Sequence, residues 1–160
     1  MIALYVVGAV VGLLVLMALV GLALPRDHVA RGSATFTRSP DEVWAALVDL
    51  DAHARWRRGV KKIEQISPTS FRETGPHGVI LYEVTEDRRP ERRITHIADD
   101  KLPFGGRWIY ELAPANGGTR LTITEEGFVK NPIFRFLSKT VFSPAATIEK
   151  VLADLRAHLA

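Results

Sequence analysis

The stretch from Met1 to Leu24 constrains this chain more than any other part of it. It contains no Asp, Glu, Lys, Arg, His, Asn or Gln. A helix rises about 1.5 Å per residue, so a run of about 23 residues reaches roughly 34 Å, which exceeds the ~30 Å hydrocarbon core of a bilayer. Pro25 and Arg26 end the run. We therefore expect a transmembrane anchor over residues 1–24 and a folded domain over residues 25–160.

Two other interpretations of the apolar run stay open. A cleaved secretory signal normally begins with basic residues and has a shorter apolar core. No Lys or Arg precedes this run, and Gly21-Leu22-Ala23 is only a fair cleavage site. The third interpretation is a buried core helix.

Arg26, Arg31 and Arg38 follow the run closely. The positive-inside rule then predicts a single-pass membrane protein whose C-terminal domain is cytoplasmic.

The charge balance of the domain narrows the class of partner. All 21 Lys and Arg and all 18 Asp and Glu lie beyond the apolar run, and the net charge is +3. A nucleic-acid-binding protein would present a larger basic surface with interleaved aromatic residues, so we expect no nucleic-acid partner. The domain has the length of a single folded unit with a real core. It contains no Cys, which excludes disulfides.

The first part of the domain predicts one strand followed by helices. Residues 29–38 alternate apolar and polar side chains, as a half-buried strand does. Ser39-Pro40-Asp41-Glu42 then combines an N-cap, a proline at the first helical position and a capping-box carboxylate. Apolar residues at helical spacing continue to Leu50, and a short second helix is expected over residues 52–57.

A meander and a final helix complete the expected α+β fold. Period-two patterns bounded by Gly, Pro and Asn turns predict six further antiparallel strands, over 61–67, 70–74, 79–86, 92–98, 107–113 and 119–128. Asn131-Pro132 starts a helix, and Ser143-Pro144 either kinks or restarts it. The helix carries an apolar stripe formed by Ile148, Val151, Leu152, Leu155 and Leu159. Glu149, Lys150, Asp154 and Arg156 are expected on the opposite, solvated face.

Several local sequences in this order resemble a known superfamily. They are Ser39-Pro40-Asp41-Glu42-Val43-Trp44, then Trp56, then the segments 102–108 and 118–127, and finally Asn131-Pro132. Together they resemble the START-like or SRPBCC superfamily, the helix-grip fold of lipid-transfer domains, pollen-allergen-like proteins and polyketide cyclases. The likeness covers residues 29–159. It implies a curved sheet around a long C-terminal helix, with a hydrophobic cavity beneath that helix, but it does not imply one activity.

No motif for metal, nucleotide or nucleophilic chemistry is present. The five histidines include no pair at i, i+4 spacing, and neither HExxH nor Cys ligands occur. GxSxG, P-loop and GxGxxG motifs are also absent, and the glycines at 75, 78, 105 and 106 suit turns better. We therefore predict no metal, no cofactor and no catalytic residue.

The candidate ligand-binding residues are aromatic or polar side chains expected to face the cavity. Strand alternation groups Ile80, Tyr82 and Val84, and likewise Ile94, His96 and Ala98. It also groups Trp108, Tyr110 and Leu112, and Leu121, Ile123 and Glu125. From these groups and the helix end we select Trp56, Tyr82, His96, Trp108, Tyr110 and Glu125. A few convergent polar groups can orient an otherwise apolar ligand. The alternative is that these side chains are ordinary core residues.

Two basic clusters could approach an anionic membrane surface. The first runs over residues 55–62 and has five positive residues and no acid, and the second comprises Arg88, Arg89, Arg92 and Arg93. The alternative is solvated loops balanced by nearby carboxylates.

Three functions are compatible with these features. The favoured one is a membrane-anchored, non-catalytic binding domain for a hydrophobic small molecule or lipid. The second is a structural or interaction module whose core is filled by its own Trp56, Trp108, Phe134, Phe136 and Phe142. The third is a cyclase/dehydratase-type enzyme that would use His96, Tyr82 or Glu125 as acid or base.

Overall fold

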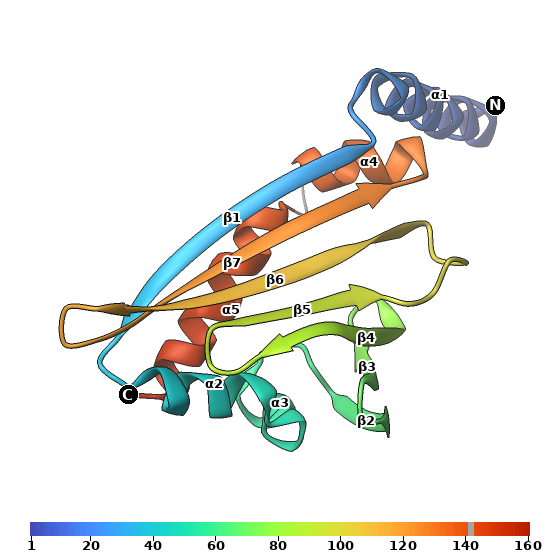
Figure 1. The fold of residues 1–160 in the computed structure, drawn as a ribbon. Coiled ribbons are helices and arrows are strands. Elements are labelled where there is room, and N and C mark those ends of the chain that lie inside the picture. Colours follow the sequence, from blue (N-terminus) through green and yellow to red (C-terminus); the bar gives the residue numbers. More distant parts are fainter. Residues whose placement is uncertain (141–142) are drawn as a thin grey trace.

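The computed structural model describes residues 1–140 and 143–160, except for the side chain of residue 140. Phe142, one of the proposed core-filling residues, lies outside the described part. Five helices and seven strands are present in the described part (Figure 1). The helices are α1 (Ile2–Ala23), α2 (Pro40–Val48), α3 (Leu50–Trp56), α4 (Pro132–Thr140) and α5 (Pro144–His158). The strands are β1 (Asp27–Phe36), β2 (Lys62–Ser67), β3 (Ser70–Gly75), β4 (Gly78–Arg88), β5 (Arg92–Ile97), β6 (Phe104–Ala115) and β7 (Gly118–Val129).

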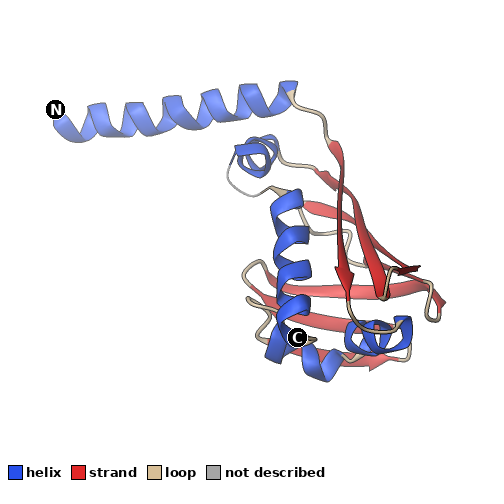
Figure 2. Cartoon of the chain, turned by 90° about the vertical axis from the view of Figure 1, so that its left-hand side faces the viewer, coloured by secondary structure: helices blue, strands red, loops and turns tan. Residues whose placement is uncertain are grey.

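All seven strands form one antiparallel sheet in the order β1-β7-β6-β5-β4-β3-β2. Strands β2 to β7 follow one another as a meander, and β1 closes the sheet beside β7. The sheet curves around α5, which crosses its concave side (Figures 1 and 2). The predicted α+β helix-grip architecture is therefore confirmed, and the observed strands differ from the predicted ones only at their ends.

Local sequence signals account for the helix starts. The Ser39 hydroxyl accepts a hydrogen bond from the Glu42 amide at 3.4 Å, and the Glu42 carboxylate accepts one from the Ser39 amide at 2.8 Å. This is the expected capping box. Asn131 caps α4 by accepting bonds from the amides of Ile133 and Phe134. Proline occupies the first turn of α5, so the chain restarts as a separate helix rather than continuing with a kink.

The core lies between α5 and the β1–β7 side of the sheet. Ile148, Val151, Leu152 and Leu155 of α5 are buried there with strand residues such as Leu121. Gly32 on β1 permits the close approach, because a Cβ at this position would lie 2.7 Å from Ile148 Cγ2. Helices α2 and α3 cover the end of this core, α2 with Val43, Trp44 and Leu47 and α3 with Ala52 and Trp56.

Asp154 departs from the expected pattern. It was placed on the solvated face of α5, but it is buried, and its carboxylate accepts bonds from the Arg58 amide at 2.9 Å and from Arg58 Nε at 2.5 Å. The carboxylate therefore joins the last turns of α5 to the loop after α3. A buried carboxylate with this charged partner and two hydrogen bonds is compensated, which explains how it fits beside the apolar stripe.

His53 is a second buried polar residue of the helical layer. Its Nε2 donates to the Leu47 carbonyl at 2.9 Å, which leaves Nδ1 to accept from Arg57 Nη1 at 3.4 Å. Burial, followed by the nearby charge of Arg57, lowers the pKa of His53 to about 4. The imidazole is therefore neutral at physiological pH, with its proton held on Nε2.

Helix α1 stands apart from this core. It is the one helix in the described part of the chain that is long and apolar enough to cross a membrane, a test that signal sequences also pass. Almost all of its side chains are exposed, and Gly21 is its only buried residue. Its C-terminal end packs against α4 (Figure 2). The apolar run is thus not the buried core helix considered as one interpretation of the sequence.

The apolar stripe of α5 should be essential for folding. Leu155 is fully buried, and Leu155→Asp would place an unpaired carboxylate against the sheet. We expect a loss of about 3–5 kcal/mol from a total stability of about 5–15 kcal/mol. Thermal unfolding of the full chain in detergent, followed by near-UV circular dichroism, measures this effect. Ala153→Asp on the exposed face of the same helix is the matched control. Equal stability of the two variants would contradict this packing.

Acidification should destabilise the domain through His53. Because the folded pKa of about 4 lies below the ordinary value of 6.5, the unfolded chain binds the proton more tightly. The neutral imidazole contributes about 3 kcal/mol to the free energy of unfolding. This contribution is complete above pH 6.5 and is lost as the pH falls toward 4. Unfolding free energies measured across this window should fall less steeply for His53→Gln than for His77→Gln, which changes an exposed turn residue. Parallel pH profiles would disprove the assignment.

Candidate functional site

A cavity of about 700 Å³ lies between the sheet and α5. Its walls come from β1 and strands β3 to β7, from the ends of α2 and α3, and from α4 and α5. Pockets for small organic ligands have volumes of about 300–1,000 Å³, so the cavity has the size of a ligand site. A smaller pocket of about 340 Å³ lies between the α2–α3 junction and β2–β3, and its lining is mostly polar.

Most of the cavity wall is apolar and aromatic. Ile80, Ile97, Phe104, Trp108 and Phe128 line it from successive strands. Trp108 stands beside Tyr110 with their ring centroids 6.0 Å apart. Tyr82 stacks on Phe71 with centroids 5.3 Å apart and planes inclined by 18°. These large side chains border the cavity without filling it, so the described core is not completely self-filled.

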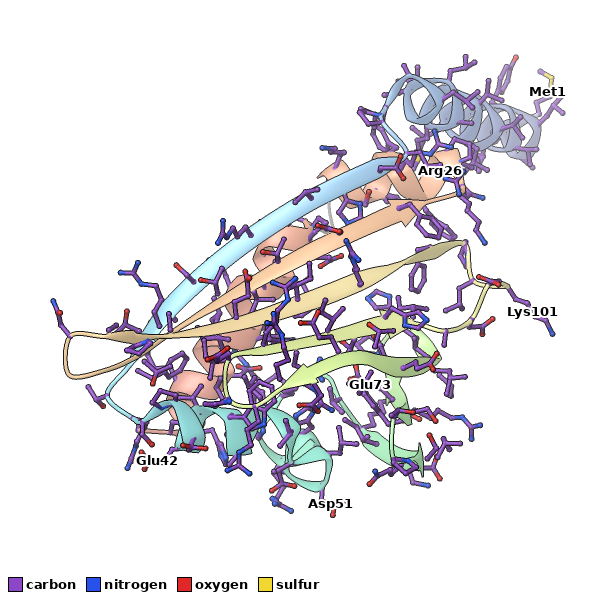
Figure 3. The ribbon with its side chains drawn as sticks, in the orientation of Figure 1. Met1, Arg26, Glu42, Asp51, Glu73 and Lys101 are labelled. Carbon is purple, nitrogen blue, oxygen red and sulfur yellow. The ribbon has the colours of Figure 1, made fainter. Side chains whose placement is uncertain are left out.

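A largely buried ion pair forms the polar end of the cavity. Arg57, at the end of α3, bonds to Glu73 of β3 through Nη1 and Oε2 at 2.8 Å, and the side chains are 19% and 13% exposed. Burial is the largest single effect and opposes the charge on Arg57, but the Glu73 carboxylate together with the Tyr110 and Tyr82 phenols raises the pKa of the guanidinium. The same Nη1 lies 3.4 Å from His53 Nδ1. Figure 3 shows Glu73 well away from Arg26, which follows α1, so this pair lies at the end of the sheet remote from α1.

Two tyrosines accompany the ion pair. Burial, together with the Glu73 carboxylate, raises the pKa of Tyr82. Burial likewise raises the pKa of Tyr110. Both phenols therefore remain protonated at physiological pH and can act as hydrogen-bond donors or acceptors. No described residue makes a hydrogen bond with the Tyr82 hydroxyl, which leaves this group available at the cavity wall.

A second polar pair lies toward the other end of the cavity. His28 of β1 and Glu125 of β7 approach to 3.2 Å between Nε2 and Oε1, and both side chains are less than one-fifth exposed. Both residues line the cavity. Arg93 of β5 also lines it, and its guanidinium pairs with Asp87. The cavity thus carries paired polar groups at separate points of an apolar wall.

Four of the six candidate residues line the cavity. Tyr82, Trp108, Tyr110 and Glu125 do so from β4, β6 and β7. Trp56 does not, because it is buried in the helical core, with its ring 5.2 Å from that of His53 and stacked 5.9 Å from that of His158. Its Nε1 has no hydrogen-bond partner among the described residues.

The expected inward orientation of His96 was wrong. In the β5–β6 ladder Thr95 lies opposite Trp108 and His96 lies opposite Arg107. Residues directly opposite each other point to the same face of a sheet, so Thr95 faces the cavity and His96 faces outward. His96 Nε2 lies 3.7 Å from Glu83 on that outer face. The apolar side chain of Ile94 suggested that Ile94 and His96 face the cavity. Ile94 is instead buried on the outer face of the sheet beside Ile109.

The polar residues Arg57 and Glu73 were not among the predicted site residues. Arg57 was assigned to a basic cluster, where its neighbours on both sides are apolar or cationic. A sequence signal for Glu73 did exist, because it lies two residues after the buried Phe71 in β3 and so shares its face. Nothing in the sequence pairs the two residues, because they lie on different elements.

The second basic cluster is neutralised rather than free. Arg88 and Arg92 both pair with Glu86, Arg92 also pairs with Glu111, and Arg89 pairs with Asp41. With the Arg93–Asp87 pair, every arginine of this cluster has an acidic partner. The alternative of balancing carboxylates therefore holds, but the solvated loop does not, because Arg92 and Arg93 lie in β5 and Arg93 lines the cavity. Among the described residues no group of three His, Asp or Glu is placed to hold a metal ion.

Comparison with known proteins identifies the fold. A START superfamily protein from Mycobacterium smegmatis superposes with a TM-score of 0.68 at 16% identity, over 82% of this chain and 97% of that one. A protein from Thermus thermophilus gives 0.70 at 18% identity, over 82% and 97%. A conserved protein from Geobacillus kaustophilus gives 0.68 at 19% identity, over 82% and 95%. No curated protein matches the sequence.

A family model supplies the assignment. The model described as "Polyketide cyclase / dehydrase and lipid transport" matches residues 27–160, which is nearly the whole chain beyond the apolar run. The resemblance to the START-like superfamily is thereby confirmed, and with it a fold that is known to bind hydrophobic ligands. The chain belongs to the polyketide cyclase/dehydrase and lipid transport family.

Proposed function

We propose that this protein is a membrane-anchored, non-catalytic binding domain that holds a hydrophobic small molecule or lipid in the cavity beneath α5. The observation that carries the proposal is the cavity itself, which combines about 700 Å³ of space with a mostly apolar wall and a few buried polar groups. This combination suits a ligand with a long apolar part and a small polar part.

The charges in the wall favour an uncharged polar end on that ligand. The positive charge of Arg57 is already balanced by Glu73, and that of Arg93 by Asp87. A carboxylate or phosphate brought to this end would meet the Glu73 carboxylate in a poorly solvated space, at an electrostatic cost. A hydroxyl or carbonyl could instead bond to the Tyr82 phenol and the remaining N–H groups of Arg57.

The two alternative functions have less support. A self-filled interaction module does not need a space of this size, so the cavity favours binding. Of the three residues considered as acid or base, His96 faces outward and does not line the cavity. The raised pKa of Tyr82 makes its phenol a poor base near neutral pH, and Glu125 is engaged by His28.

The membrane part of the proposal rests on α1. Its 22 helical residues suffice to span a hydrocarbon core, and its side chains are exposed to the surroundings rather than packed in the protein. Arg26, Arg31 and Arg38 follow the helix closely, which favours a cytoplasmic domain at residues 25–160. An anchored cavity would exchange its ligand with the bilayer without releasing the protein.

Contact of a bound ligand with Trp108 provides the test. The full chain is placed in lipid nanodiscs with a fatty alcohol brominated in mid-chain, because bromine quenches tryptophan fluorescence on contact. Trp108 lines the cavity, whereas Trp44 and Trp56 are 3% and 8% exposed in the core. We expect strong quenching of the native protein and little quenching of Trp108→Phe. The brominated fatty acid of equal length should quench less at pH 7, because its carboxylate is disfavoured beside Glu73.

Two outcomes would contradict the proposal in different ways. Equal quenching of the native protein and Trp108→Phe would show that no brominated chain enters the cavity. Stronger quenching by the acid than by the alcohol would leave binding intact but reject the uncharged polar end.

A further inference from the structure

We infer that the mouth of the cavity lies against the membrane surface. Helix α4 holds the domain to the C-terminal end of α1, and the mouth is on the side of the domain toward which α1 extends. The inference rests on the proposed anchoring role of α1. The interaction surface is the mouth of the cavity, and its partner is the headgroup layer of the bilayer that α1 crosses.

The joint between α1 and α4 is close and specific. A Cβ at Gly21 would lie 1.8 Å from the Pro132 carbonyl oxygen, so only glycine permits this approach. Arg135 of α4 directs Nη1 to the carbonyls of Gly21 and Leu24, at 3.4 Å each. Its Nε and Nη2 donate to the carbonyls of Val129 and Lys130, at 2.9 Å each. One side chain thus ties the end of α1 to the end of β7, and a cation suits the negative end of the α1 dipole.

This joint sets the direction in which the domain faces. Figure 2 shows α1 extending from the domain on the side occupied by α4 and α5, with the sheet on the opposite side. If α1 crosses a bilayer, the α4–α5 side therefore faces that bilayer and the outer face of the sheet faces away from it. Helix α4, packed beside the last turns of α1, then lies at the level of the headgroups.

The mouth of the cavity is on this side. The residues that both line the cavity and are exposed define it, and we call them the rim: the β3–β4 turn at 76–78, Phe134 of α4, and Ala146, Thr147 and Lys150 of α5, with Arg58, Gly59 and Ser143 beside them. Phe134 is 47% exposed although it is large and apolar. An exposed aromatic ring beside the end of a spanning helix suits the interface between water and lipid.

The charge of the rim fits the same partner. No acidic residue is present among the exposed residues that line the described cavity, whereas Lys150 is cationic. Arg58 is exposed and cationic too, although its guanidinium pairs with the buried Asp154 carboxylate. The exposed acid nearest to Lys150 in α5, Glu149, lies against β1, close to the position of a Gly32 Cβ. Cytoplasmic leaflets are anionic and attract such a surface. Arg58 and the lysines at 61 and 62 belong to the first basic cluster of the sequence, which gives that cluster a place beside the rim.

The absence of cysteine permits a direct test on the full chain. Single cysteines at Phe134 and Ala146 mark the rim, one at Leu13 marks the middle of α1, and one at Ser33 marks the exposed outer face of β1. Each is labelled with an environment-sensitive fluorophore in phosphatidylcholine vesicles containing some phosphatidylglycerol. Quenching by lipids that carry a nitroxide just below the headgroup is then measured. We expect severalfold stronger quenching at 134 and 146 than at 33. Two rim positions are used so that one perturbing substitution does not decide the result.

The outcomes separate this inference from the proposed function. Quenching at 134 and 146 as weak as at 33, with the label at 13 shielded in lipid, would overturn the membrane-facing mouth and leave the anchor intact. A label at 13 that is fully accessible to water-soluble quenchers would overturn the anchor and the inference together. Strong quenching at 134 that is lost when Gly21 is replaced by Leu would further support the α1–α4 joint.

Discussion

The packing of α5 against β1 and β7 determines the rest of this structure. The helix makes its main strand contacts with these two strands, where Gly32 lets it approach closely. The sheet then curves away through β6, β5, β4 and β3, and α5 does not follow it. The combination of a close contact at one edge and a curved sheet creates the cavity, so the space is a consequence of the fold rather than a packing defect.

The packing of α5 does not explain the polar groups inside the cavity. Removing an ion pair such as Arg57–Glu73 from water costs more than an apolar pair of similar volume would, and buried pairs are often dispensable for stability. Here the guanidinium is held by a second partner as well, because Arg57 Nη1 lies 3.4 Å from His53 Nδ1. A rigid, neutral and hydrogen-bonding end inside an apolar space provides orientation for a ligand, and stability alone does not require it.

The fold could be predicted from the sequence because its signals are local. The capping box at Ser39–Glu42, the turn residues between strands and the stripe of α5 each act within a few residues, and all were found in place. The site was predicted only in part, because its geometry is not local. Both Ile94 and Thr95 are buried, so burial could not reveal which one faces the cavity. Arg57 and Glu73 meet only after the chain has turned through β2, and Asp154 is buried because Arg58 reaches it from 96 residues away.

The central claim is that the cavity holds a hydrophobic molecule in the native membrane. Organic extraction of the full-length protein purified from its own membranes, followed by mass spectrometry, tests it most directly. The matched variants are Ile97→Trp, which fills the cavity, and Val79→Trp, which adds the same ring at an exposed position. We predict one class of molecule with an uncharged polar end, enriched over bulk lipid in the native protein and in Val79→Trp and depleted in Ile97→Trp. The same bulk-lipid profile in all three proteins would contradict the account.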